Sequence, residues 1–234
     1  MILVQTIFLT EIALAADSNN SSPTNIKEKQ TVNNKALPPD SINTSTLVSR
    51  IPVYSPPLRG APRGRMGGGT RSGDKTLIQA LSPGHTGMTI SEQPTLYFYQ
   101  STDKDVLLEF TLVALDAEEP LLETQFKSSG EKLQSIDLSA FNIKLAANIE
   151  YLWYITIVIN PKLRAQDIVS GGNIQYKPAN NDLNTAIFQA NSEQRVAILA
   201  QNGIWYDAIM ATQRDPTTRL QLSQLVQQVG ITQP

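Results

Sequence analysis

From about residue 76 onward, short apolar runs alternate with segments rich in turn residues. The run at 105–115 (DVLLEFTLVAL) has apolar side chains at every second position, which predicts a strand with one buried face. Its inward positions are Val106, Leu108, Phe110, Leu112 and Ala114, and its outward positions include Glu109 and Thr111. The run at 149–160 (IEYLWYITIVIN) is apolar on both faces, which is typical of a central strand.

The same pattern extends over most of the body. The predicted strands cover 75–81, 95–100, 105–115, 120–126, 132–138, 149–160 and 167–177. Hairpin-length connections separate these runs, and no helical pattern lies between them. This arrangement predicts a mainly β fold, an immunoglobulin-like antiparallel β-sandwich. Gly171 and Gly172 in the last run predict a bulge or kink.

Beyond residue 180 the apolar positions repeat at helical spacing, which predicts a C-terminal extension of three or four helices. The helical segments are 180–190, 191–203, 204–215 and 215–230. Asn191 or Ser192 is expected to begin the second segment as its N-cap, with Gln194 in the capping-box position. Gly203 and Gly230 are expected to end helices as C-caps.

The N-terminal part has a different composition. The first sixteen residues, MILVQTIFLTEIALAA, form an apolar run that ends in a small-x-small pattern of the kind that signal peptidase cleaves. No Lys or Arg precedes the run and Glu11 interrupts it, so an apolar disordered end is the alternative. Residues 17–58 are rich in Asn, Ser, Thr, Lys and Pro, which predicts a disordered linker.

One stretch within this linker, LVSRIPVYSPPL, is more apolar than its surroundings. We expect it to dock on the folded body as an extended segment, and Pro56 and Pro57 favour polyproline geometry there. The side chains available for docking are Val48, Ile51, Val53 and Tyr54.

Composition limits the chemistry of the chain. Its 234 residues include no cysteine, which excludes disulfides and thiolate zinc sites, and a single histidine, His85, which excludes sites that need two imidazoles. The net charge is −2, but residues 50–75 carry +5 and the remainder carries −7. This split suits intramolecular docking or an anionic partner, whereas the overall charge does not favour nucleic acid.

The positive charge is concentrated in an Arg/Gly-rich segment, PLRGAPRGRMGGGTR. It lacks the Gly-Lys-Ser/Thr ending of a P-loop, and it occurs once in an acidic chain, unlike the repeats of nucleic-acid-binding tails. A structural strap is favoured, in which glycines lie closely over the sandwich and arginines pair with carboxylates or carbonyls. An anion or partner site built from Arg63, Arg65 and Arg71 is the main alternative, and catalysis is the least favoured.

The predicted strand at 149–160 carries the aromatic motif YLWY, and the helical segment at 204–215 carries the motif WYD. We expect Trp153 and Trp205 to pack in the core, with Trp205 wedging the helices against the sheet. Asp207 is then available to accept hydrogen bonds from an arginine. We therefore expect a pair between Arg71 and Asp207 that links the strap to the helices.

Neither the histidine nor the acidic clusters complete a catalytic or metal-binding arrangement. His85 lies in SPGHTG, where a solvated turn histidine is expected. Asp116, Glu118 and Glu119 lack the alternating spacing of a calcium loop and are expected at a solvated hairpin tip. No enzyme activity, cofactor or metal site is predicted.

Four stretches, taken in order, resemble one known family. They are RGAPRGRMGGGTR, LIQALSP…TGMTISEQPTLYFYQ, EYLWYITIVI and AILAQNGIWYDAI. Together they resemble the cyanobacterial family called domain of unknown function 928, over roughly residues 57–231. The resemblance implies an exported protein with no assigned activity and a β-rich body followed by helices. Members of that family often carry two cysteines, where this chain has Asp74 and the pair Ile159 and Asn160.

The sequence thus predicts that the chain is divided into five segments. They are a signal-like segment at 1–16, a disordered linker at 17–58, an Arg/Gly-rich strap at 59–75, a β-sandwich at 76–179 and a helical extension at 180–234.

The favoured function is a non-enzymatic interaction module of the cell envelope, periplasmic or extracellular. It would bind an unknown protein or an anionic envelope component, with no nucleic-acid partner and no transmembrane segment.

The candidate binding residues and one alternative function complete this prediction. The candidates are Arg63, Arg65, Arg71, Trp205 and Asp207. The alternative is a carbohydrate-binding or glycan-acting envelope protein, which would use Tyr97, Tyr99 and Trp153 as an exposed aromatic surface.

Overall fold

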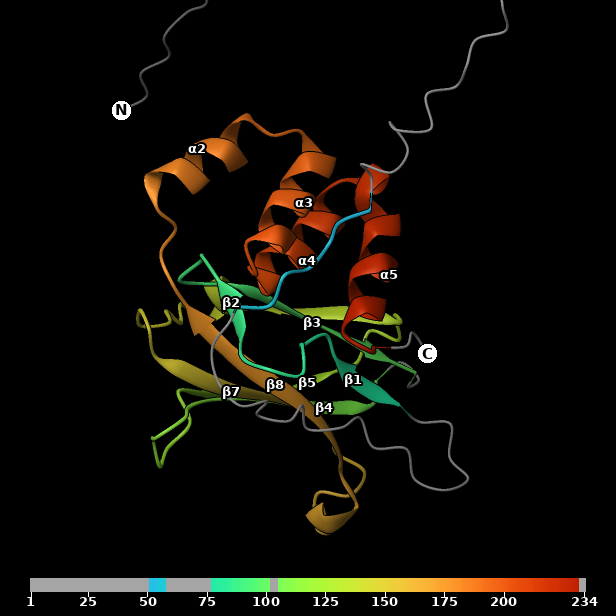
Figure 1. The fold of residues 1–234 in the computed structure, drawn as a ribbon. Helices are drawn as coiled ribbons and strands as arrows, with labels where there is room; N and C mark the ends of the chain where they lie inside the picture. Colours follow the sequence, from blue (N-terminus) through green and yellow to red (C-terminus); the bar gives the residue numbers. More distant parts are fainter. Residues whose placement is uncertain (1–50, 58–76, 102–104, 232–234) are drawn as a thin grey trace, which may run out of the picture. The chain divides into compact units, whose positions relative to one another are not determined.

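The structure is a computed structural model of the chain, and it describes residues 51–57, 77–101 and 105–231. All of these residues belong to the unit Asn43–Pro234. They form two β-sheets and four α-helices, together with three short 3₁₀ turns (Figure 1).

The smaller sheet has three antiparallel strands in the order β1-β3-β6. Its strands are β1 (Ile78–Ala80), β3 (Thr95–Gln100) and β6 (Leu133–Asp137). The larger sheet has five strands in the order β2-β8-β7-β4-β5. Its strands are β2 (Gly87–Thr89), β8 (Ile168–Tyr176), β7 (Glu150–Ile157), β4 (Leu107–Ala114) and β5 (Leu122–Lys127).

The alternation along β4 is confirmed. Leu108, Phe110 and Leu112 are completely buried on its inner face. Strand β7 lies inside the larger sheet with β4 and β8 on either side, as its apolar sequence predicts. Glu109, predicted to face outward, is nevertheless buried because Arg164 from the β7–β8 connection covers it.

The sequence prediction missed strand β2 and the parallel pairing that it makes. All other pairs in both sheets are antiparallel, but β2 pairs in parallel with the far end of β8. Strand β2 has three residues and begins at the last residue of SPGHTG, so its pattern is too short to separate from the turn. The fold is therefore not purely antiparallel.

The four helices confirm the predicted helical segments. They are α2 (Asn181–Gln189), α3 (Ser192–Gln201), α4 (Trp205–Arg214) and α5 (Arg219–Gln228). Asn191 and Gln194 form the predicted capping box at the start of α3. Gly203 and Gly230 have left-handed backbone, with φ of +73° and +69°, directly after α3 and α5.

Helices and strands contribute about equally to the described residues, so "mainly β" understates the helical part. The 3₁₀ turns are η1 (Leu138–Phe141), η2 (Arg164–Gln166) and η3 (Pro216–Thr218). Figure 1 shows the helices gathered on one side of the strands. Helix α4 contacts β3 of the smaller sheet and β2 of the larger one, and a single apolar core joins helices and sheets.

The glycine pair of β8 forms no bulge, so the bulge that the sequence predicts is wrong. The register between β7 and β8 runs without interruption through both glycines. Their function is close approach: a Cβ on Gly172 would lie 2.0 Å from Ser82 Oγ, just after β1. Beside them, Ser170 Oγ accepts a hydrogen bond of 2.9 Å from the Ala80 amide, which joins the two sheets at this point.

We expect Gly172→Ala to lower the free energy of unfolding by ~1–3 kcal/mol, because the added methyl overlaps Ser82 and forces the sheets apart. Gly84→Ala is the matched control, since a Cβ at Gly84 would meet nothing within 4 Å. Urea unfolding of both variants measures the difference. Equal midpoints for the two variants would contradict the close-approach explanation.

Candidate functional site

The candidate site is built around the first turn of α4, which carries the WYD motif. Gly203, in left-handed conformation, turns the chain sharply from α3 into α4. This turn directs the first residues of α4 into the core, so that Trp205, Tyr206 and Asp207 are all buried. Core packing of both tryptophans is confirmed, because Trp153 is also completely buried.

The Tyr206 hydroxyl lies at the centre of this site. It accepts a 2.9 Å hydrogen bond from Trp153 Nε1 on β7 and donates one of 2.9 Å to the Asn173 carbonyl on β8. It also lies 3.1 Å from Ser82 Oγ, which follows β1. Burial raises the pKa of Tyr206 to about 12, so the hydroxyl stays neutral. One side chain thus joins α4 to both sheets.

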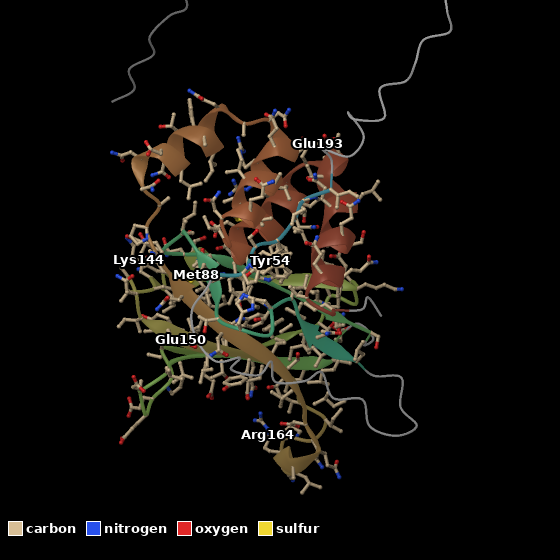
Figure 2. All side chains as sticks on the ribbon, viewed as in Figure 1. Tyr54, Met88, Lys144, Glu150, Arg164 and Glu193 are labelled. Carbon is tan, nitrogen blue, oxygen red and sulfur yellow. The ribbon has the colours of Figure 1, made fainter. Side chains whose placement is uncertain are left out.

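The network continues from Asn173 to the loop that carries the histidine. The Asn173 side-chain amide donates to Glu150 Oε1 at 2.6 Å, and Thr86 Oγ1 donates to the same oxygen at 2.7 Å. Glu150 begins β7 and lies below Tyr54 in the view of Figure 2. The loop between β1 and β2 is therefore fixed next to His85.

Residues 51–57, which we call the docking segment, lie extended against α3 and α5. The Ser55 amide donates to the Ala200 carbonyl at 3.1 Å, and the Tyr54 amide donates to Gln228 Oε1 at 2.9 Å. Docking is confirmed for Tyr54, which is 8% exposed, but Ile51 and Val53 are 55% and 56% exposed and point outward. Buried and exposed side chains alternate along the segment because only one side of an extended chain faces the body. Val48 lies outside the described residues.

Tyr54 inserts between the helices and the strands (Figure 2). Its ring packs edge-on against Trp205, with centroids 4.8 Å apart, while Trp205 Nε1 donates to the Leu81 carbonyl at 2.8 Å. The Tyr54 hydroxyl is hydrogen-bonded to His85 Nε2 at 2.8 Å, and the two rings stack. His85 is therefore not the solvated turn residue expected from sequence: it is half-buried, and burial lowers its pKa.

Asp207 holds the end of β2. Its Oδ2 accepts a 3.1 Å hydrogen bond from the Ile90 amide, and Thr89 also hydrogen-bonds to it. Burial raises the pKa of Asp207 despite these bonds and the attraction of Arg214. Arg63, Arg65 and Arg71 lie outside the described residues, so the pair between Arg71 and Asp207 stays a prediction.

A cavity of about 280 Å³ opens beside this motif. Its lining is largely apolar and includes Pro57, Met88, Ile90, Lys177, Leu183 and Ile204. Lys177 is the only charged residue among the described residues that line it. The cavity adjoins the end of the docking segment, which supplies Pro57.

The described residues contain no group of three or more His, Asp or Glu side chains that could hold a metal ion. Asp116, Glu118 and Glu119 are exposed at the β4–β5 hairpin tip, which confirms the predicted tip. The aromatic surface of the carbohydrate alternative is wrong for two of its three residues. Trp153 and Tyr99 are 0% and 4% exposed, because their strand positions face the core, and Tyr97 is half-buried.

A second surface, missed by the sequence analysis, lies between the edge strands of the two sheets. Strands β5 and β6 border a groove with a volume of about 680 Å³. Its lining includes the apolar residues Phe126, Leu133, Ile136 and Phe141 and the charged residues Lys127, Glu131 and Asp137. Apolar and polar residues alternate along each strand, but only the structure shows that both are edge strands and that they border the same groove.

The sequence analysis also missed an ion-pair network on the outer face of the larger sheet. Arg164 in η2, near the foot of Figure 2, makes a two-pronged contact with Glu109 and also pairs with Asp167. The guanidinium holds the pKa of Glu109 below its ordinary value. Gln125 on β5 donates to the same carboxylate at 2.7 Å, which connects the network to the groove.

The chain belongs to the family described as Domain of Unknown Function (DUF928), whose model matches residues 59–233. No curated protein matches the chain. The match includes the Arg/Gly-rich segment, the YLWY strand and the WYD helix, so the motifs that carry the resemblance all fall within the family region. No helix among the described residues is long and apolar enough to cross a membrane.

We expect Tyr206→Phe to lower the free energy of unfolding by ~1–3 kcal/mol, because the buried Trp153 N–H loses its acceptor. Tyr154→Phe is the control, because Tyr154 directly follows Trp153 in β7 and its side chain faces the opposite side of the sheet. Chemical unfolding monitored by tryptophan fluorescence measures both. A loss for Tyr206→Phe no larger than for Tyr154→Phe would show that the hydroxyl network does not stabilise the fold.

The lowered pKa of His85 predicts a stability that depends on pH. The unfolded chain binds the proton at an ordinary pKa of about 6.5, whereas the folded chain resists protonation. Stability is therefore full above about pH 6.5 and is lost as the pH falls through the lower, folded-state pKa. His85→Gln, which keeps a polar group near Tyr54, should remove this component. Urea unfolding midpoints of the unchanged protein and of His85→Gln are compared from pH 7.5 to pH 5. If the midpoints of both change with pH in the same way, His85 is not the source of the pH dependence.

Proposed function

We propose that this protein is a non-enzymatic interaction module, exported to the cell envelope, that binds an extended segment of a partner protein in the groove between β5 and β6. The observation that carries this proposal is the pair of edge strands that border one groove. The body itself is an immunoglobulin-like sandwich in this proposal. Consecutive strands β5 and β6, which belong to different sheets, support that architecture.

Edge strands offer backbone groups to a partner. Within the described residues, β5 pairs only with β4 and β6 pairs only with β3. Each strand therefore has one side on which its amides and carbonyls face away from the sheet. An extended partner segment that adds to either strand gains main-chain hydrogen bonds, while side-chain pockets in the groove give specificity.

The side chains of the groove fit such a partner. Its apolar lining includes Phe126 and Phe141, and Phe141 is 39% exposed. Lys127, Glu131 and Asp137 add charged groups to the lining, and interfaces combine apolar and polar groups in this way. The motifs that attract attention in the sequence have internal partners instead: Trp153, Trp205 and Asp207 all hydrogen-bond within the body.

Export and envelope location rest on the sequence. The signal-like run at 1–16 and the polar stretch that follows it, up to the docking segment, would place the body at the end of a tether. Arg63, Arg65 and Arg71 remain candidates for a second contact, to an anionic envelope component.

The groove is tested by site-specific photo-crosslinking in envelope preparations of the source cells. A photoreactive residue replaces Phe141 or Ser135 in the groove, or Phe188 or Leu220 on the helices as matched exposed controls. Phe188 and Leu220 are 87% and 77% exposed, so access to the probe is at least as good there. We expect one discrete adduct from both groove positions and none from the helix positions.

Failure has a clear form in this experiment. Adducts at all four positions, or at the helix positions alone, would overturn the groove as the binding surface. The absence of any adduct in preparations where the chain is folded and present would overturn the interaction function itself.

A further inference from the structure

The docking segment lies against a surface of its own, whose residues differ from those that line the groove between β5 and β6. We call it the segment groove and define it by Ala200 of α3, Trp205 of α4, Gln228 of α5 and His85. Its polar groups bind the backbone of an extended chain. The Gln228 side chain accepts from the Tyr54 amide and donates to the Pro52 carbonyl at 2.8 Å, as a neighbouring strand would.

The segment groove also selects side chains. Pro52 and Tyr54 are buried, whereas Ile51, Val53 and Ser55 face outward. Tyr54 gains both an aromatic contact with Trp205 and a hydroxyl contact with His85, so a tyrosine fits this position better than a purely apolar ring.

The far end of the groove requires a glycine. A Cβ on Gly203 would lie 2.8 Å from the Ser55 carbonyl oxygen and 3.2 Å from the Pro57 ring. The backbone at Gly203 is therefore free of a side chain where the prolines lie. The groove thus fits an extended peptide of the pattern Pro-x-Tyr-x-x-Pro. It needs an occupant, because the part of Trp205 that packs against Tyr54 would otherwise face water.

The connection between segment and body allows another copy to supply this occupant. Nineteen residues, 58–76, join Pro57 to Leu77, and such a length spans up to ~65 Å when extended. Fifty residues precede the segment. A segment that is held by a few hydrogen bonds and one buried aromatic ring, with a long connection to the rest of the body, is suited to exchange between identical chains.

We propose that the segment groove is a peptide-binding site for a tyrosine flanked by prolines, and that residues 51–57 of a second copy of this chain occupy it when the copies are concentrated. At low concentration the segment of the same copy occupies the groove, because a tethered ligand has an effective concentration of ~1 mM. Reciprocal exchange then joins copies through a contact that each already makes internally. This surface is separate from the groove of the proposed function.

The absence of cysteine from the chain allows a clean test by energy transfer. Full-length Val53→Cys carries a donor dye and full-length Leu220→Cys carries an acceptor; both positions are exposed, at 56% and 77%. The two preparations are mixed over a range of concentrations up to ~1 mM. We expect energy transfer that rises with concentration.

Competition identifies the contact. A synthetic peptide with the sequence of residues 49–59 should abolish most of the transfer, whereas the same peptide with alanine in place of its tyrosine should need at least ~10-fold more to do so. Tyr54→Ala in the donor chain should lower transfer in the same way, and peptide competition provides the result even if that variant folds poorly.

Two results would overturn the proposal. One is no concentration-dependent transfer, which would mean that the segment never leaves its own copy. The other is transfer that both peptides leave unchanged, which would place the contact between copies elsewhere. Neither result bears on crosslinking at Phe141, so the proposed function would stand or fall independently.

Discussion

The rest of the structure depends on one buried hydroxyl group, that of Tyr206. Three polar groups from separate parts of the chain converge on it: the Trp153 indole, the Ser82 hydroxyl and the Asn173 carbonyl. Each of these groups is buried away from water, so its free energy in the folded state depends on Tyr206 being in place. Because α4 supplies the hydroxyl, the helices are required to complete the sheets. Without the helices, the Trp153 indole would lose the acceptor that the Tyr206 hydroxyl provides.

Close packing around this hydroxyl also determines which surfaces stay open. Gly172 allows Ser82 to lie against β8, and Asp207 holds β2 at the edge of the larger sheet. The helices cover the sheets on this side, and the docking segment covers Trp205 in turn. Open surface is left at the opposite edges, where β5 and β6 end their sheets. The hydrogen-bond network of Tyr206 and the two grooves are thus consequences of one packing arrangement.

The sequence predicts local structure well because each element carries its own signal. The alternation in β4, the capping box at α3 and the glycines after α3 and α5 are all local, and each is confirmed. What depends on pairing between distant residues is not predicted. The parallel partner of β2 is one example, and the use of Gly172 for close approach is another. The site follows the same rule: burial of Trp205 is predicted from its type, whereas the bond between Tyr54 and His85 requires knowledge of two loops in space.

The parallel pair of β2 and β8 has a consequence for the order of folding. A parallel neighbour cannot form through a hairpin, and here five strands, β3 to β7, lie between the two strands in sequence. Because Asp207 also holds the residues at the end of β2, that strand is fixed only after α4 exists. Such non-local contacts slow folding, since the intervening chain must be ordered before they form. We therefore expect the β4–β5 and β7–β8 hairpins to form before β2 takes its place beside β8.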